Sequence, residues 1–244
     1  SRILSGNFKK DDEVDNFSDK ENPIYLSLLD TEKKVAISTQ KEQEQQWVLE
    51  GESKLAAILQ KNESVEILSN EVLKYIVDYS NSAQGNLYLW DEKEESLKMI
   101  ARYAYNRKKY EFENFKIGED LVGQCGFEKA SIYRTEVPET YFKITSGIKG
   151  DIKPTSLFFV PLLNNKDLLG VIEIASNNEM SEAVQNFIET ASQITSQTLF
   201  NILTNEKTKQ FLNEALEMGK ELKEQKLTLE QNAEEMKATQ EEIV

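Results

Sequence analysis

The sequence predicts an α+β fold, in which an antiparallel sheet packs against helices. Two pairs of apolar segments are joined by short polar turns, at residues 86–105 and 156–175, as expected for β-hairpins. Apolar residues recur at helical spacing before the first hairpin and after the second. Glycines and prolines interrupt residues 118–155, a pattern typical of turns and loops. We therefore expect a sheet that closes over a small cavity, with helices on both sides of it in the chain.

The composition argues against several classes of function. The chain carries 43 acidic and 29 basic residues, a formal net charge of -14, and no basic stripe, so we expect no direct contact with nucleic acid. It has no histidine, which excludes the metal, haem and catalytic-triad sites that need imidazole. Its single cysteine, Cys125, cannot form a disulfide within one chain and fits a reducing cytoplasm.

The sequence shows neither a signal peptide nor a stretch of roughly 20 apolar residues that could span a bilayer. We therefore expect this part of the protein to be cytoplasmic and to make no membrane contact of its own. The chain opens without methionine and ends within a heptad at Val244. These features predict a piece of a longer protein, whose other parts could include an anchor in the inner membrane.

A long first helix is predicted to begin at Pro23, because proline suits the first helical turn. Residues 1–22 before it are polar and favour turns. Apolar residues then follow at spacings of three or four, with polar interruptions: Leu26, Leu29, Ile37, Trp47 or Val48, Leu55 and Ile58. This thin seam fits an exposed amphipathic helix and a two-chain coiled coil equally well.

A second helix is predicted between a cap at Asn62 or Ser64 and the polar run that begins at Ser80. Its apolar face comprises Val65, Leu68, Val72, Ile76 and Tyr79. The first hairpin follows, with strands at residues 86–90 and 97–105. Alternation in the second strand predicts one packed face, formed by Leu97, Met99, Ala101, Tyr103 and Tyr105.

The middle of the chain is predicted to be broken into short elements. Gly118 and Gly123 bracket a turn before a short helix at residues 124–129, and a strand at 131–135 comes next. Residues 139–155 form the longest irregular stretch between strands, and such loops are usually mobile or functional.

The second hairpin is predicted to pair residues 156–163 with residues 168–175. Pro161 lacks a backbone N–H, which predicts an edge position or a bulge at that point. Glu173 lies within the apolar run V-I-E-I-A, where it is either buried with a partner or exposed on the other face of the strand. Of these two alternatives we expect exposure to solvent.

A last helix is predicted to begin after a cap at Ser181 and to continue without a stop signal. Its first part has an apolar face of Val184, Phe187, Ile188, Ala191, Ile194, Thr198 and Ile202. Six residues at intervals of seven then form coiled-coil a positions: Thr208, Ala215, Leu222, Leu229, Met236 and Ile243. The d positions change from apolar to polar along the chain: Phe211, Met218, Gln225, Asn232 and Thr239. Polar d residues weaken a coiled coil but fix its register.

Four segments resemble, in order and spacing, motifs of the GAF family of small-molecule sensor domains. They are I-G-E-D-L-V-G-Q-C at 117–125, S-I-Y-R-T-E-V-P at 131–138, S-L-F-F-V-P-L at 156–162 and L-L-G-V-I-E-I-A-S at 168–176. The resemblance implies a central antiparallel sheet of five or six strands, with helices on one face and a ligand pocket on the other. It also implies three parts: a linker helix at residues 1–46, a GAF sensor domain at 47–203 and a coiled-coil signalling helix at 204–244.

Further segments resemble a bacterial GAF subgroup found in membrane-associated signalling proteins. They are W-V-L-E-G at 47–51, Y-A-Y-N-R-K-K-Y at 103–110 and the glutamate-rich helix near the end of the chain. In that subgroup the helix leads to a PAS domain or a histidine kinase, which implies a two-component system. The opening I-L-S-G-N-F is similar to the second half of a HAMP linker, so residues 1–46 are expected to include a HAMP-like remnant.

The resemblance also narrows the ligand. The residues Ser176-Asn177-Asn178-Glu179 lack the lysine found in family members that bind cyclic nucleotides, and bilin-binding members generally need a histidine. We therefore expect an unknown small-molecule ligand, and no haem, bilin or metal.

The candidate ligand-binding residues are chosen by chemical type. Four tyrosines could line a pocket with flat apolar faces, and two residues of the long loop could offer hydroxyls. With the one thiol, the set comprises Tyr103, Tyr105, Cys125, Tyr133, Tyr141, Thr145 and Ser146. Core packing explains any single tyrosine equally well, and an ordinary turn explains the hydroxyls. For Cys125 we expect packing, because no histidine can activate it.

These observations predict a non-enzymatic sensor that forms a parallel homodimer through its flanking helices. A ligand would shift the packing of the last helix, and the coiled coil would carry the change to a downstream PAS or kinase domain. Two alternatives remain open. One is a GAF domain without a pocket that acts in dimerisation and spacing; the other is a cysteine-based redox enzyme of the sulfoxide-reductase type, which would need a resolving cysteine or an activating group.

Overall fold

A computed structural model describes residues 23–61, 64–104, 107–108, 114–137, 144–146 and 150–242. Internal contacts divide the chain into two units, Ser1–Glu50 and Gly51–Val244. The described part of the first unit belongs to helix α1, Pro23–Leu59, which begins at the predicted proline. Its apolar residues Leu28, Val35 and Ile37 are exposed. The choice between a solitary amphipathic helix and a coiled coil therefore stays a prediction.

An antiparallel sheet forms the centre of the second unit, which confirms the predicted fold class. Within the described residues, its strands follow the order β3-β2-β1-β9-β8-β5, and β4 also pairs with β2. The strands are β1 Gln84–Asp91, β2 Ser96–Ala104, β3 Arg107–Lys108, β4 Asn114–Lys116, β5 Ile132–Arg134, β8 Ser156–Asn164 and β9 Asp167–Ser176. Both predicted hairpins, β1–β2 and β8–β9, are present.

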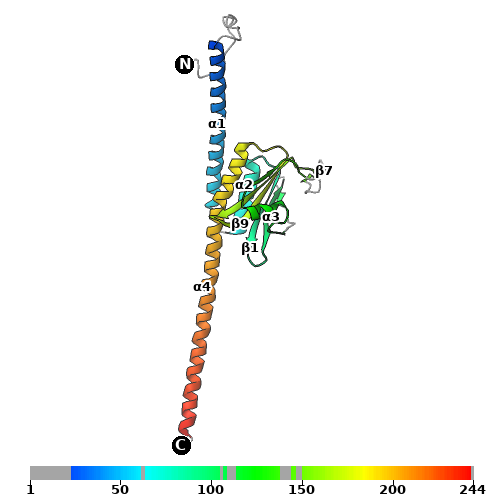
Figure 1. The fold of residues 1–244 in the computed structure, drawn as a ribbon. Helices are drawn as coiled ribbons and strands as arrows, with labels where there is room; N and C mark the ends of the chain where they lie inside the picture. The colour runs from blue at the N-terminus through cyan, green and yellow to red at the C-terminus, as the bar shows by residue number, and fades with distance from the viewer. Residues whose placement is uncertain are drawn as a thin grey trace. The chain divides into compact units, whose positions relative to one another are not determined.

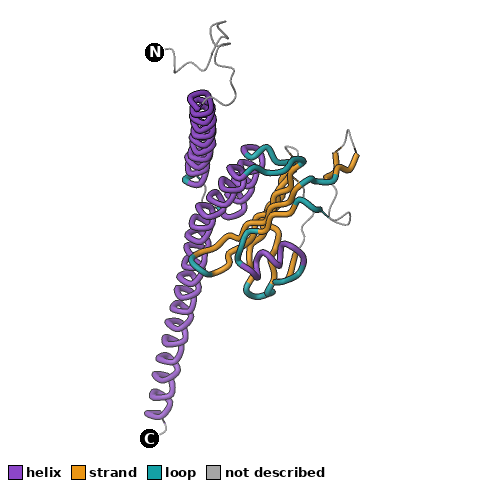
Figure 2. The backbone as a smooth tube through the Cα atoms, turned by 45° about the horizontal axis from the view of Figure 1, so that its top comes forward, coloured by secondary structure: helices purple, strands orange, loops and turns teal. Residues whose placement is uncertain are grey.

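Helices cover both faces of this sheet (Figures 1 and 2). Helix α2, Val65–Tyr79, packs on β1 and β2, and α4, Glu182–Glu242, packs on β8 and β9. Helix α3, Asp120–Glu128, lies on the opposite face and begins four residues before its predicted start. We call the two sides the helix face, under α2 and α4, and the α3 face.

The helix face is held by residues that the sequence pattern identifies. Leu68, Val72 and Ile76 are fully buried and recur every four residues along α2. Phe187 of α4 lies against Tyr79 of α2, with ring centroids 4.9 Å apart. The predicted cap of α4 is present, because the Val184 N–H donates to Ser181 Oγ at 3.4 Å. Beyond the sheet, α4 continues as a single helix (Figure 1).

A β-bulge divides the side chains of β2 between the two faces. The register pairs Leu97 with Trp90, Met99 with Tyr88, Ala101 with Leu87 and Tyr103 with Gly85. Ile100 is the extra residue, so the alternation of side chains shifts by one at this point. The prediction that all these β2 residues share one face is therefore wrong, although each of the four is buried. The fifth, Tyr105, lies outside the described residues.

Two predictions about loops and edges have different outcomes. The stretch at 139–155 is not wholly irregular, because β6, Ile144–Ser146, pairs with β7, Gly150–Ile152. Pro161 behaves as predicted: β5 pairs only as far as Phe159, so the proline lies in the edge part of β8, and a register shift follows between Leu162 and Leu163.

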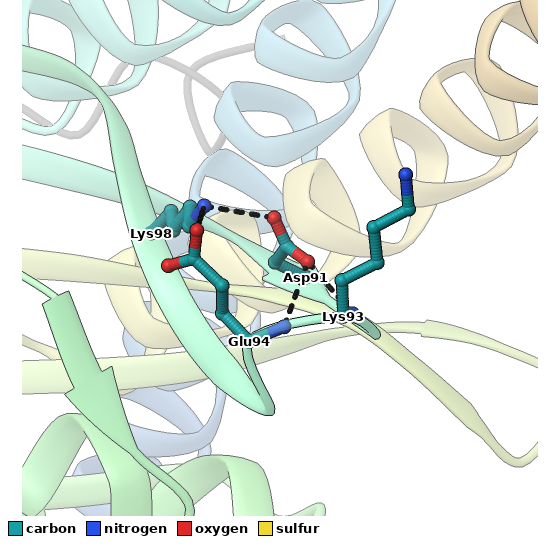
Figure 3. Close-up of polar contacts among 4 residues, drawn as sticks. All are labelled: Asp91, Lys93, Glu94 and Lys98. Atoms are coloured by element: carbon teal, nitrogen blue, oxygen red, sulfur yellow. Dashed lines mark hydrogen bonds and ion pairs between the residues drawn. The ribbon is translucent and has the colours of Figure 1, made fainter.

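The turn between β1 and β2 is closed by side chains of its own polar residues (Figure 3). Asp91 Oδ1 accepts hydrogen bonds from the backbone N–H groups of Lys93 and Glu94, at 2.8 and 3.1 Å. Lys98 Nζ forms ion pairs with Asp91 and Glu94, at 2.9 and 2.6 Å. The Lys98 interaction holds the pKa of Asp91 below its usual value, and these two carboxylates raise the pKa of Lys98. The turn therefore fixes the hairpin register locally.

Candidate functional site

The α3 face carries a mixed apolar and polar surface. Antiparallel partners share a face, so the pairing of β1 with β9 places alternate residues of both strands on this side. Its buried apolar residues pack against Val122 and Cys125 of α3, and include Tyr88, Leu97, Met99, Leu157, Phe159, Val171 and Ala175. Polar residues of β1 and β9 lie in the same rows: Gln84 opposite Ala175, and Asn86 opposite Glu173.

Glu173 is buried on the α3 face, with 2% of its surface exposed. The expectation that it faces solvent is therefore wrong, because β9 lies between β1 and β8 and both of its faces are covered. Its Oε2 accepts hydrogen bonds from Asn86 Nδ2 and from Tyr88 Oη, each at 2.8 Å. A buried carboxylate needs such donors, since they replace lost water. The residues thus form a connected polar cluster inside an otherwise apolar face.

Two further polar side chains of β1 belong to this cluster. Gln84 and Asn86 are 1% and 3% exposed. Among the described residues, none hydrogen-bonds Gln84 Nε2 or Asn86 Oδ1, and both atoms are buried. Arg102 of β2 lies opposite Asn86 on its other side and is half-buried. Arg102, Asn86 and Glu173 therefore form one row across three neighbouring strands, which we call the polar row, with Gln84 beside it.

The sequence did contain a signal for this cluster. In N-L-Y-L-W, Asn86, Tyr88 and Trp90 alternate with leucines and must share a face of the strand. Residues 86–90 were predicted as a strand of the first hairpin, but Asn86, Glu173, Gln84 and Arg102 were not among the predicted site residues. The alternation alone does not show that this face is buried, because the burial depends on β9 lying beside β1.

Two of the proposed tyrosines lie on the helix face, away from the polar row. Tyr103 donates from its hydroxyl to Asp78 Oδ2 at 3.4 Å, and burial, followed by the nearby Asp78 charge, raises its pKa. It borders a surface hollow of about 540 Å³ whose other lining residues are Val77, Asp78, Asn81, Ser82, Ala83, Asn177 and Asn178. Tyr133 packs edge-on against Phe158 and accepts a hydrogen bond from the Met180 N–H at 2.8 Å.

Cys125 lies on the α3 face and is completely buried. Its thiol donates to the Ala130 carbonyl at 3.4 Å. Burial, with a smaller contribution from the Glu128 charge, raises the pKa of the thiol to about 12. The reactive thiolate is therefore scarce near neutral pH, and Cys125 acts as a small apolar side chain in the core.

The remaining predicted site residues lie in or beside the β6–β7 segment. Thr145 and Ser146 belong to β6, where their backbones pair with Asp151 and Gly150. Tyr105 and Tyr141 lie outside the described residues. The structure thus brings Cys125 to the α3 face and separates it from Tyr103 and Tyr133.

Within the described ranges, no group of three or more His, Cys, Asp or Glu side chains could hold a metal ion. No helix in the part of the chain that the structure describes is long and apolar enough to cross a membrane.

Comparison with known proteins identifies the fold. No curated protein matches the sequence significantly. Among solved structures, the chain is similar to the GAF domain of a phosphoenolpyruvate-protein phosphotransferase from Acinetobacter, with 17% identity and a TM-score of 0.55 over 64% of this chain and 94% of that one. The corresponding domain from Coxiella burnetii has 16% identity and a TM-score of 0.56, over 65% of this chain and 96% of that one.

An enzyme shares the same fold. The free methionine-R-sulfoxide reductase of Neisseria meningitidis, solved with its substrate, is 12% identical with a TM-score of 0.51, over 63% of this chain and 88% of that one. These likenesses concern the fold alone. The family model described as "GAF domain" matches residues 62–199, which is more than half of the chain. The chain therefore belongs to the GAF domain family.

Proposed function

We propose that this chain is a non-enzymatic input module of a bacterial signal-transduction protein, which binds a small molecule and relays a conformational change through α4. The observation that carries the proposal is the continuity of α4. One helix of 61 residues begins on the sheet and runs on without interruption far beyond it. A rigid helix of this kind can transmit a shift at one end to the other, because its backbone hydrogen bonds keep it in one piece.

The first part of α4 is firmly attached to the sheet. Phe187, Ile188 and Ala191 are fully buried on the helix face. Ser196 Oγ donates to the carbonyl oxygen of Leu163, in β8, at 2.6 Å. Strands β8 and β9 pair along their whole length, so a displacement at Glu173 on the α3 face reaches β8 and then α4 through direct contacts.

The last part of α4 favours a parallel homodimer. Its apolar a positions Leu222, Leu229 and Met236 are 63–71% exposed in the single chain. A second copy of the same helix would cover them. A parallel, in-register pair places Gln225 against Gln225 and Asn232 against Asn232, whereas an antiparallel pair would place these amides against apolar residues. A downstream PAS or kinase domain would then receive two identical helices.

The two alternative functions, a spacer without a pocket and a redox enzyme, would each require different properties of the α3 face. A spacer without a pocket needs only a filled core and has no use for the buried polar row. A redox enzyme of the sulfoxide-reductase type needs a reactive thiolate. Cys125 is buried with a pKa of about 12, which opposes that chemistry.

Native mass spectrometry tests the proposal on the purified chain, before and after incubation with a protein-free bacterial extract. We expect a dimer that carries a discrete small molecule and releases it at higher collision energy. A monomer would contradict the relay through a coiled coil. A dimer that never carries added mass would contradict sensing and favour the spacer.

A further inference from the structure

A surface hollow lies beside α4, at the edge of the sheet where β5 ends. Strand β5 pairs with β8 only as far as Phe159, so from Val160 onward the outer edge of β8 has no neighbouring strand among the described residues. The hollow has a volume of about 480 Å³, which is within the range of small-molecule sites. Its apolar part consists mainly of Val160, Pro161 and Leu163 of β8, and none of the residues of the polar row lines it.

The rest of the hollow comes from α4, from the β8–β9 turn and from the link between α3 and β5. Glu189, Gln193 and Gln197 recur every four residues and therefore lie on one side of α4. The link begins at Lys129, which has a left-handed backbone with a φ of 52°. Lys129 Nζ donates to the carbonyl oxygen of Lys166, in the turn between β8 and β9, at 2.5 Å. The fold therefore holds this part of the hollow in place.

Most of the polar groups in the hollow are carboxamides. Gln193, Gln197, Asn164 and Asn165 each present one acceptor oxygen and one NH₂ donor group, and Ser131 adds a hydroxyl. None of these five side chains hydrogen-bonds to a described residue. All of them are therefore available to a bound molecule, and each can both donate and accept.

The two charged groups of the hollow do not favour an ionic ligand. Glu189 is negative and Lys129 is positive, so their charges cancel. An anion would meet the carboxylate of Glu189, and a cation would meet the ammonium group of Lys129. A neutral molecule avoids both repulsions.

We propose that this hollow binds a small, neutral, polyhydroxylated molecule, the class that includes the sugars and sugar alcohols. Each hydroxyl group of such a molecule donates and accepts hydrogen bonds, which matches carboxamides that offer both functions. Its C–H groups can lie against the apolar side chains of Val160, Pro161 and Leu163. A purely apolar molecule would leave the carboxamides without partners.

A ligand in this hollow would contact the sheet and the relay helix together. Ser196 Oγ of α4 donates to the carbonyl oxygen of Leu163, and Leu163 itself lines the hollow. A molecule that contacts Leu163 and Gln193 at once therefore bears directly on the joint between β8 and α4. The inference goes beyond the proposed function, because binding in the hollow requires neither a dimer nor a ligand on the α3 face.

Ligand-observed NMR titrations of the full chain test the chemical class. The neutral probes are glucose, mannitol and myo-inositol. Gluconate and glucosamine are the charged probes, since they add a negative and a positive charge to a similar framework. We expect at least one neutral probe to bind, and neither charged probe to bind more tightly than it does. Binding of no neutral probe, or tighter binding of a charged one, would show that the inference is wrong.

Three variants place the binding in the hollow. Gln193→Leu/Gln197→Leu removes two carboxamides and should weaken binding at least about tenfold, as expected for two lost hydrogen bonds. Both residues are exposed and leucine favours helices, so the fold should be kept. Gln210→Leu, at an exposed position of α4 outside the hollow, is the control and should leave binding unchanged. Ala130→Trp fills the hollow from an exposed position and should abolish binding without lowering the melting temperature. Unchanged binding in the first and third variants would overturn the site.

Amide hydrogen exchange with a bound neutral probe separates this site from the polar row. We expect protection in β8 between Val160 and Leu163 and in α4 around Gln193. Protection confined to β1 and α3 would place the ligand on the α3 face and contradict the inference.

The outcomes also separate this site from the proposed function. If native mass spectrometry finds a monomer but a neutral probe binds in the hollow, the proposed relay fails and the site stands. If it finds a dimer with a bound small molecule and no neutral probe binds, the site fails and the proposed function stands.

Discussion

The two faces of the sheet differ in the buried polar groups that they carry. On the helix face, the hydroxyls of Ser192, Thr195 and Ser196 in α4 donate to backbone carbonyl oxygens, at 2.6–2.7 Å, and Ser69 Oγ of α2 is buried without a hydrogen bond to any described residue. On the α3 face, Asn86 and Gln84 keep buried amide atoms that no described residue satisfies, next to the carboxyl group of Glu173. The part of the helix face under α4 therefore has the properties of a structural joint, whereas the α3 face has the buried amide and carboxyl groups.

This difference indicates that the two faces of the sheet have separate roles. A joint must be well packed to transmit movement, whereas a binding surface keeps polar groups ready for a ligand at some expense in stability. Side chains of neighbouring residues in one strand point to opposite faces, so β9 contacts both surfaces at once. Substitutions on the two faces should therefore have separable effects on stability and on binding.

The largest effect is expected for Phe187→Ala on the helix face. Phe187 is fully buried and packs against Tyr75 and Tyr79. Removing a buried phenylalanine side chain should lower the free energy of unfolding by about 3–5 kcal/mol, measured by urea denaturation. Phe127→Ala is the control, since Phe127 is 70% exposed and should change stability by less than about 0.5 kcal/mol. Equal losses in both variants would show that the helix face is not the firm joint described here.

The double variant Gln225→Leu/Asn232→Leu comes next and concerns the coiled coil. Both residues occupy polar d positions, and replacing them with leucine should stabilise the dimer by about 3 kcal/mol, from newly buried apolar surface. Analytical ultracentrifugation and thermal unfolding would measure this effect. Lys223→Ser, at a position outside the seam, provides the control. An unchanged oligomeric state and melting temperature would contradict the heptad assignment.

A smaller effect is expected for Tyr88→Phe on the α3 face. The variant removes the hydroxyl that donates to Glu173 Oε2. Loss of a hydrogen bond to a charged group should lower the free energy of unfolding by about 1.5–3 kcal/mol. Tyr133→Phe on the helix face is the matched variant, since among the described residues its hydroxyl accepts a hydrogen bond from the backbone N–H of Met180, a neutral bond worth about 1 kcal/mol. A larger loss of stability for Tyr133→Phe than for Tyr88→Phe would contradict this comparison of the two faces.

The smallest effect is expected at the exposed β1–β2 turn. The pKa of Asp91 is lowered in the fold, so its stabilising contribution is present above the ordinary pKa of aspartate and is lost as the pH falls through the lowered value. The pKa of Lys98 is raised, so its contribution persists at neutral pH and is lost as the pH rises through that raised value. Asp91→Ala should lower the melting temperature slightly at neutral pH and hardly at all in strong acid. A loss that is independent of pH would show that the charge of Asp91 is irrelevant.

Local features of the fold were predictable from the sequence because their causes are local. Pro23, the cap at Ser181, the polar hairpin turns and the edge position of Pro161 each depend on nearby residues. The bulge in β2 was not predictable, since Ile100 differs in no visible way from its neighbours and only the pairing with β1 reveals it.

The site was harder to predict because it depends on residues distant in the chain. Glu173 is buried because β1, more than 80 residues earlier in the sequence, lies beside β9. Choosing aromatic residues by type led to Tyr103 and Tyr133, which the bulge and the β5–β8 register place on the helix face. The alternation of Asn86, Tyr88 and Trp90 was visible, but their hydrogen-bond partner was not.

The most direct test of the central claim is amide hydrogen exchange along the chain. The protein would be compared in a protein-free bacterial extract and in the same extract depleted of small molecules by dialysis. The proposed relay predicts that the small molecules slow exchange in β1 and β9 and also change exchange in α4, both on the sheet and beyond residue 203. A change confined to the strands, with α4 unaffected, would contradict the relay.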